Sequence, residues 1–280
     1  MRIDLYCVMG HPVAHSKSPW IHARFAELTG QPLRYEPRLV PLDGFAASLR
    51  EFINDRTGNA RGCNVTVPFK FEAAALADTA SERVALAQAA NTLRFDLGAI
   101  HADNTDGIGL VHDLQHNAGV DLRGRELLLL GAGGAAAGVL GPLIEAGPAR
   151  IVVANRTLPK AEALVTRHRA LALLRNTELE VKSLSSLEVD FDVIINATAS
   201  SLAGAAVPVP ARVLKSGALA CDLMYGPAAR GFLDWAREHG ASARDGLGML
   251  VEQAAEAFHL WRGVRPPSAQ VLAELRALLE

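Results

Sequence analysis

The sequence has 280 residues, of which 50% are apolar and 21% are charged, a composition ordinary for a globular enzyme. One hydrophobic core rarely organises so long a chain, so two domains are expected. The formal net charge is −2 and no basic block occurs, which argues against a nucleic-acid or membrane-surface partner.

The cysteines indicate a reducing compartment. Cys7, Cys63 and Cys221 lie far apart, and no CxxC pair occurs, so neither a disulfide framework nor a zinc site is expected. The first ten residues contain only a short apolar run and no cleavage site of small residues, so no signal peptide is predicted. The sequence therefore predicts a cytoplasmic protein that holds no metal.

The first hundred residues alternate between strand-like and helix-like segments. Ser18 and Pro19 form a helix start, with Ser18 as the expected cap, and Gly30 forms the stop. Residues 89–96 and 99–106 form either a pair of short strands or a strand and a loop. Strands are expected at 3–10, 33–40 and 62–68, and helices at 18–30, 44–55 and 69–80.

From residue 107 onward the alternation is more regular, and it predicts a parallel, doubly wound sheet in a second α/β domain. Residues 127–144 contain no charge over 18 positions, long enough for a membrane helix, but five glycines and Pro142 favour a strand, a turn and a buried helix. Strands are expected at 125–130, 149–154, 191–198 and 217–226, and helices at 107–119, 158–171, 230–240 and 246–263. The pattern does not assign the last helix to either domain.

The stretch "GAGGAA", Gly131 to Ala136, follows a predicted strand and opens a predicted helix. This arrangement fits the dinucleotide fingerprint, in which glycines let the backbone approach a pyrophosphate and the helix terminus supplies N–H donors. The alternative is a tight turn without a ligand.

The next strand ends in "ANRT", which contains Asn155, Arg156 and Thr157, and Lys160 follows one turn later. An NAD site requires an acidic side chain here for the ribose hydroxyl, and no carboxylate occurs before Glu162. A guanidinium beside a hydroxyl suits a 2′-phosphate, so NADP is favoured over NAD. The alternative is a solvated basic loop.

Two further motifs contain residues suited to catalysis. In "HSKSP", the hydroxyls of Ser16 and Ser18 beside a helix N-terminus could bind a carboxylate, although capping alone also explains Ser18. In "NVTVPFK", Lys70 falls in the first turn of a helix, where the helix dipole disfavours a cation. Lys70 could instead be a surface residue, and Asp106 in "DNTDGIG" could be a helix cap.

Together these motifs resemble those of the shikimate dehydrogenase family. The matching segments, in order, are "GHPVAHSKSPWIH", "NVTVPFK", "ANTL", "DNTDGIG", "GAGGAA", "NRT", "DLMYGP" and "DGLGMLVEQAAEAF". The resemblance implies NADPH-dependent reduction of 3-dehydroshikimate to shikimate, on the route to aromatic amino acids. It also implies two α/β domains. The N-terminal substrate domain, residues 1–106, is completed by C-terminal helices in 247–280, and residues 107–246 form a Rossmann-type NADP domain.

The resemblance also implies roles for individual residues. Lys70 and Asp106 would form the catalytic pair. Substrate-binding residues would be Ser16, Ser18, Thr66, Asn91, Tyr225 and Gln253. NADP(H) would contact Gly131, Ala132, Gly133, Gly134, Ala135, Asn155, Arg156, Thr157, Lys160, Leu223 and Gly246. Gln253 is notable by itself, because it is a polar residue on the apolar face of its helix.

Three positions depart from the usual pattern of the family. Ser201 follows "NAT" in a region where a glycine is usual, Arg230 replaces a common threonine, and Lys160 replaces a frequent arginine. None of the three is Lys70 or Asp106. Alternatives are a quinate/shikimate dehydrogenase using NAD and a catalytically silent NADP-binding module. Either a monomer or a homodimer is compatible with the sequence.

Overall fold

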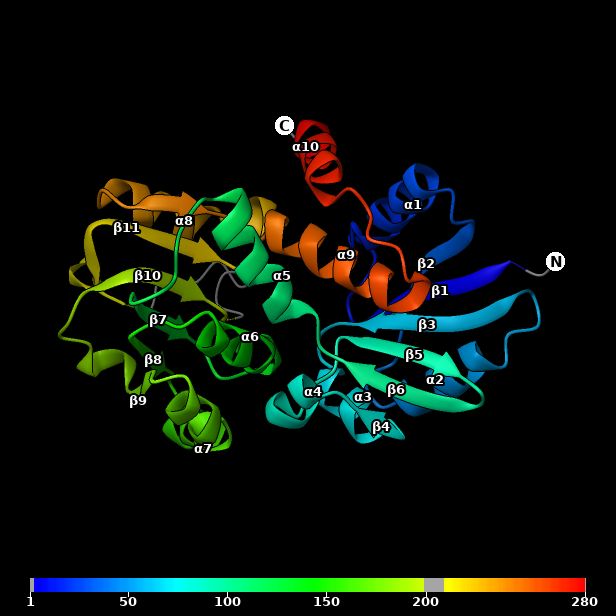
Figure 1. Cartoon of the computed structure of the whole chain (residues 1–280), viewed down its shortest axis with the longest axis horizontal. Helices are drawn as coiled ribbons and strands as arrows, with labels where there is room; N and C mark the ends of the chain where they lie inside the picture. Colours follow the sequence, from blue (N-terminus) through cyan, green and yellow to red (C-terminus); the bar gives the residue numbers. More distant parts are fainter. Residues whose placement is uncertain (1–2, 199–208, 280) are drawn as a thin grey trace. The chain divides into compact units, whose positions relative to one another are not determined.

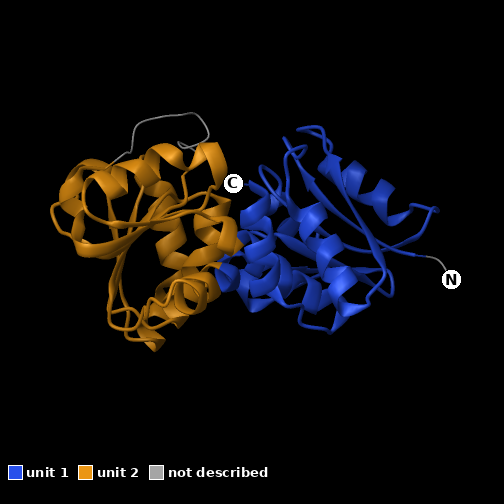
Figure 2. Cartoon of the chain, turned by 90° about the horizontal axis from the view of Figure 1, so that it is seen from above, with its two compact units in different colours: residues 1–109, 250–280 blue, residues 110–249 orange. Residues whose placement is uncertain are grey.

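The computed structural model describes residues 3–198 and 209–279, so Ser201 lies outside the described residues. The chain forms two compact units (Figure 2). Unit 1 contains residues 1–109 and 250–280, and unit 2 contains residues 110–249. The sequence-based boundaries lie after residues 106 and 246.

Unit 1 is built on a mixed six-stranded sheet with the order β2-β1-β3-β5-β6-β4 (Figure 1). β1 runs parallel to β2 and β3, whereas β5 is antiparallel to both β3 and β6. The region 89–106 therefore contains a strand pair, because residues 97 and 98 turn the chain back. The strands are β1 Asp4–Gly10, β2 Leu33–Leu39, β3 Asn59–Val65, β4 Thr79–Ala80, β5 Thr92–Asp96 and β6 Ala99–Asp103.

Two helix starts in unit 1 bear on the candidate site. α1 begins at Ser18 itself, with Lys17 at the N-cap position, so the expectation that Ser18 caps this helix is wrong. The Ser18 amide instead donates to the Ser16 hydroxyl at 3.3 Å. α3 begins at Lys70, one residue after its cap Phe69. The helices of this unit are α1 Ser18–Thr29, α2 Phe45–Ile53, α3 Lys70–Ala75, α4 Glu82–Ala87, α10 Ser268–Leu279 and, from residue 250 onward, α9 Leu247–Arg262.

Both faces of β1 are buried, because successive side chains of a strand point to opposite faces. Cys7 and Met9 face a core that includes Phe45 and Phe69. Tyr6 and Val8 face the other side, in a smaller cluster with Tyr35 and Trp261. This second cluster brings aromatic rings from β1, β2 and α9 (Leu247–Arg262) together.

Unit 2 is built on an all-parallel sheet with the order β12-β11-β10-β7-β8-β9. This is the doubly wound order of dinucleotide-binding folds, in which ligands bind at the carboxyl ends of the strands. The segment 127–144 forms a strand, a turn and a helix, as predicted. The strands are β7 Glu126–Leu130, β8 Arg150–Ala154, β9 Glu178–Lys182, β10 Phe191–Asn196, β11 Leu214–Asp222 and β12 Ser242–Arg244.

The helices of unit 2 are α6 Gly134–Glu145, α7 Leu158–Leu174 and α8 Arg230–Glu238. α5 Asp106–His112 begins in unit 1 and ends in unit 2, and it continues into a π-helical turn, Asp113–Asn117. None of the helices among the described residues has the length and apolar character needed to cross a bilayer.

Candidate active site

The first feature of the site is an ion pair between Lys70 and Asp106. The Lys70 Nζ lies 2.5 Å from Asp106 Oδ2, and the two side chains are only 13% and 8% exposed. Lys70 is the first residue of α3 and Asp106 the first residue of α5. The buried carboxylate neutralises the ammonium at a helix N-terminus, where a cation alone would be unfavourable.

Asp106 is fixed by amide side chains from neighbouring segments. Asn91 Nδ2 donates to Asp106 Oδ1 at 2.8 Å, so each carboxylate oxygen has a donor. The Asp106 backbone amide donates to Asn104 Oδ1 at 3.1 Å, and Asn104 Nδ2 donates to the Ala89 carbonyl at 2.8 Å. Because these amides are buried, the carboxylate cannot turn away from Lys70 without leaving polar groups unsatisfied.

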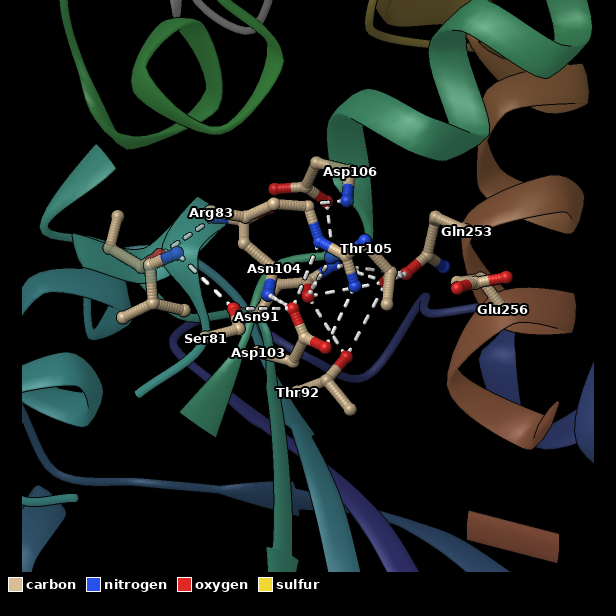
Figure 3. Close-up of polar contacts among 12 residues, drawn as sticks. Ser81, Arg83, Asn91, Thr92, Asp103, Asn104, Thr105, Asp106, Gln253 and Glu256 are labelled. Carbon is tan, nitrogen blue, oxygen red and sulfur yellow. Dashed lines mark hydrogen bonds and ion pairs between the residues drawn. The ribbon is translucent and has the colours of Figure 1, made fainter. Parts of the chain in front are cut away.

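Asn91 is the centre of this cluster (Figure 3). Its Nδ2 also lies 2.9 Å from Thr105 Oγ1 and 3.2 Å from Gln253 Oε1, and its Oδ1 accepts from the Thr105 amide at 2.8 Å. Gln253 projects from α9, where it is 8% exposed, and its Nε2 donates to the Leu250 carbonyl at 2.9 Å. The structure thus brings together Lys70, Asn91, Asp106 and Gln253, from four separate parts of the sequence.

The loop before Asp106 is braced by a second ion pair. Arg83 donates to both carboxylate oxygens of Asp103, at 3.0 and 2.8 Å, and the Ser81 hydroxyl donates to Asp103 Oδ1 at 2.7 Å (Figure 3). Asp103 Oδ1 also accepts from the Asn104 amide at 2.7 Å. This arrangement holds the strand end from which Thr105 and Asp106 project.

The Tyr35 phenol is buried and is hydrogen-bonded to Asn64. Its hydroxyl donates to Asn64 Oδ1 at 2.7 Å, and Ser18 lies near enough to affect its pKa. Burial raises the pKa of Tyr35 well above its usual value, nearby thiols add to the rise, and the Ser18 hydroxyl opposes it. Thr66 follows β3 two residues after Asn64, and its amide donates to the Met9 carbonyl at 2.9 Å.

Three residues of this region were not identified from the sequence: Tyr35, Asn64 and His22, whose ring stacks on that of Tyr35. His22 lies on the buried face of α1 together with Ser18, Ile21 and Phe25. A histidine at helical spacing within an apolar face was the available signal. Asn64 is a buried polar residue in a strand, next to Cys63 and Val65, and this was a comparable signal.

In unit 2, the glycine turn has a backbone conformation compatible with the dinucleotide fingerprint. Gly131 has φ +107°, a conformation that other residues rarely adopt, and a Cβ there would lie 3.0 Å from the Ala197 carbonyl oxygen. α6 begins at Gly134, and its N-cap Gly133 supplies no side-chain cap. The first N–H groups of the helix therefore remain available to an anion.

The end of β8 carries basic and neutral side chains. Arg156, Thr157 and Lys160 are exposed, and Asn155 Nδ2 donates to the Thr157 carbonyl at 2.8 Å. No acidic residue occurs in the turn that these residues form. Together with the glycine turn, they fit a dinucleotide with a 2′-phosphate, because guanidinium and ammonium groups favour a phosphate at this position.

Leu223 and Gly246 lie against each other, since the Leu223 carbonyl contacts Gly246 and the Gly246 amide donates to the Met224 carbonyl at 2.8 Å. Leu223 follows β11, and its amide donates to the Asn196 carbonyl at 3.0 Å, at the carboxyl end of β10. Tyr225 is half-buried on the same loop of unit 2. Among the described residues, no three histidine, cysteine or carboxylate side chains are placed to hold a metal ion.

The two sheets and these residue clusters define an α/β oxidoreductase of the dinucleotide-binding class. Three family models match the chain in order. They are the shikimate dehydrogenase substrate binding domain at residues 8–93, shikimate / quinate 5-dehydrogenase at 113–205 and the shikimate 5'-dehydrogenase C-terminal domain at 246–276. The chain belongs to the shikimate dehydrogenase family, as its motifs predicted.

Individual relatives match over nearly the whole length. A shikimate dehydrogenase (NADP(+)) from Acidovorax sp. is 69% identical over 99% of this chain and 97% of its own length. The structure of an Ael1 enzyme from Pseudomonas putida is 47% identical, with a TM-score of 0.87 over 97% of this chain and 98% of that chain. A Thermus thermophilus shikimate 5-dehydrogenase in complex with NADP(H) and shikimate is 33% identical, with a TM-score of 0.85 over 99% of this chain and 100% of that chain.

Proposed function

We propose that this chain is an NADP-dependent shikimate dehydrogenase, which reversibly reduces 3-dehydroshikimate to shikimate. The observation that carries the proposal is the Lys70–Asp106 pair, held by buried amides in a member of this family. A ketone accepts a hydride only when its oxygen receives a proton or is stabilised as negative charge develops on it. The Lys70 ammonium can meet both needs.

Lys70 donates a proton from Nζ to the carbonyl oxygen during reduction and accepts it back during oxidation. Asp106 balances the charge of the ammonium and, because Asn91 holds its second oxygen, keeps Nζ in one position. The bound NADPH supplies the hydride. Ketone, hydride and proton together give the alcohol, so no other reactant is required.

The remaining side chains of unit 1 bind and orient the substrate. Ser16, Ser18 and Thr66 hold the carboxylate with their hydroxyls, which can all donate hydrogen bonds. Asn91 and Gln253 bind ring hydroxyls with amide groups that can both donate and accept. The family resemblance also assigns a role in substrate binding to Tyr225, on its loop of unit 2.

The cofactor is held by unit 2. The turn formed by Gly131, Ala132, Gly133, Gly134 and Ala135 binds the pyrophosphate with backbone N–H groups. Asn155, Arg156, Thr157 and Lys160 bind the 2′-phosphate, and Leu223 and Gly246 contact the nicotinamide end. We assign substrate binding to residues 1–106 with 247–280 and cofactor binding to 107–246. A cytoplasmic location agrees with the three cysteines, which are free and buried, and either a monomer or a homodimer can perform these steps.

Turnover of shikimate with NADP tests the proposal, in comparison with NAD and with quinate. Fast turnover with NADP and shikimate alone supports it, whereas comparable rates with NAD or quinate indicate a broader quinate/shikimate dehydrogenase. NADP binding without turnover indicates a silent binding module.

The catalytic role of Lys70 has its own test. Lys70→Ala should lower kcat by about 10²–10⁴-fold while NADP still binds, because the proton donor is lost. The exposed Lys182→Ala is the control and should keep normal turnover. Near-normal turnover of Lys70→Ala would contradict the assignment.

A further inference from the structure

A chain of buried hydrogen bonds leads from Tyr35 to the Lys70–Asp106 pair. The Tyr35 phenol donates to Asn64 Oδ1 at 2.7 Å, and Asn64 Nδ2 donates to Thr92 Oγ1 at 3.1 Å. Thr92 Oγ1 donates to Asn91 Oδ1 at 2.9 Å, and Asn91 Nδ2 donates to Asp106 Oδ1 at 2.8 Å. Its last three members are labelled in Figure 3.

Every bond in this chain points the same way. Each member accepts at one atom and donates from another, and the final acceptor is the carboxylate that holds Lys70. A chain of one polarity fixes the orientation of both amide side chains, since a reversed Asn64 would place its NH₂ against the Tyr35 hydroxyl and its oxygen against the Asn91 carbonyl. Its five members, from Tyr35 to Asp106, are all buried, so water does not readily replace a lost partner.

The first member of the chain packs against α1, the helix that carries Ser18. His22, one turn after Ser18 on the buried face of this helix, stacks on the Tyr35 ring with centroids 4.2 Å apart and planes at 10°. Ring packing therefore holds the phenol at the start of the chain that ends at Asp106.

We propose that Tyr35 is a positioning residue, which holds the Lys70–Asp106 pair in place through Asn64, Thr92 and Asn91. This inference rests on the proposed function. The Tyr35 hydroxyl acts through these three side chains on the carboxylate that holds Lys70, so it keeps the proton-transferring pair aligned.

Tyr35→Phe tests the proposal, because it removes the hydroxyl and keeps the ring that packs on His22. We expect kcat/KM for shikimate to fall about tenfold, through both kcat and KM, with KM for NADP unchanged. Tyr6→Phe is the matched control. Tyr6 is the register partner of Tyr35 on β1, its phenol is buried and lies near Arg262, and it is outside the chain. Equal losses from the two variants would overturn the proposal.

A second pair of variants interrupts the chain in its middle. Thr92→Val keeps the shape of the side chain but removes the hydroxyl and should match the loss of Tyr35→Phe, whereas Thr92→Ser should restore activity to within about threefold of the parent. Because both changes break the same chain, the double variant Tyr35→Phe/Thr92→Val should lose little more kcat/KM than either single variant. Additive losses in the double variant would refute the coupling. If Tyr35→Phe cannot be purified, the comparison of Thr92→Val with Thr92→Ser tests whether the chain supports activity.

The two proposals fail in different ways. A parent protein that does not turn over shikimate with NADP contradicts the proposed function before any variant is compared. An active parent whose Tyr35→Phe and Thr92→Val variants stay within about twofold of it contradicts only the role of Tyr35.

Discussion

His22 makes the stability of this protein depend on pH in a way that one substitution should remove. The ring is fully buried and packs against Tyr35 at 4.2 Å and against Trp261 at 5.3 Å, measured between ring centroids. Burial lowers the pKa of His22 from 6.5 to about 3, and Asn64, which faces it, opposes the shift. The native ring therefore stays neutral over a range in which the unfolded ring binds a proton.

The direction of this pH dependence follows from the number of protons that each state binds. Between pH 6.5 and about 3 the unfolded state holds more protons at His22 than the native state, so the free energy of unfolding falls as pH falls. Each pH unit in this window corresponds to about 1.4 kcal/mol. From about pH 7 to about pH 4.5 the loss is about 2.5 kcal/mol, and this value changes little as long as the native pKa lies below about 4.

His22→Phe keeps a ring of similar size for stacking and removes the titration. Urea unfolding of parent and variant, at about pH 7 and about pH 4.5, should show that the variant gains about 2.5 kcal/mol relative to the parent at the lower pH. Other titratable groups contribute equally to both proteins. Glu274 is an example: hydrogen bonds from Arg24 and Gln270 lower its pKa to about 2 in parent and variant alike. The exposed His239→Gln is the control and should follow the parent. Parallel stability losses in parent and His22→Phe would refute the reasoning.

Two further predictions concern unit 2. In steady-state assays, Arg156→Ala should raise KM for NADP about 10–100-fold and leave KM for NAD nearly unchanged, because a charge-assisted bond to the 2′-phosphate is lost. Arg175→Ala, at an exposed position, is the control and should change neither KM. Gly248→Ala should lower Tm by several degrees, because its Cβ would lie 1.8 Å from Asp113 Oδ1, a fully buried atom that Arg244 holds at 2.5 Å. In the same thermal scan Gly231→Ala, where a Cβ meets open space, should leave Tm unchanged; an equal loss there would show that the Asp113 contact is not the cause.

Much of the fold could be predicted from the sequence, because its signals are local. Period-two and helical patterns placed most strands and helices, and the order strand, "GAGGAA", helix predicted the dinucleotide-binding turn that β7 and α6 form. Local patterns were weaker where pairing decides the outcome. Residues 89–106 were ambiguous in the sequence, and the structure shows that β5 pairs antiparallel with β3 and β6. Ser18 was expected to cap α1, but the helix begins at Ser18 itself and Lys17 occupies the N-cap position.

The same distinction holds for the candidate site. The sequence showed that Lys70 lies at a helix N-terminus, where a cation is unfavourable, and that Gln253 is a polar residue on an apolar helix face. Both observations depend only on residues that are near in sequence. The sequence offered no reason to connect Tyr35 with Asn64, 29 positions away, because hydrogen bonds between distant residues leave no trace in spacing or composition.

The sequence by itself therefore determined the α/β class, the family and the basic residues that favour NADP, because each depends on residue type and on short-range spacing. Only the tertiary structure decided that Lys70 and Asp106 lie 2.5 Å apart and that buried amides and hydroxyls hold them there. The physical reason is that a buried polar group must find a partner wherever the fold brings one within reach. That partner is set by how strands and helices pack and not by their order in the chain.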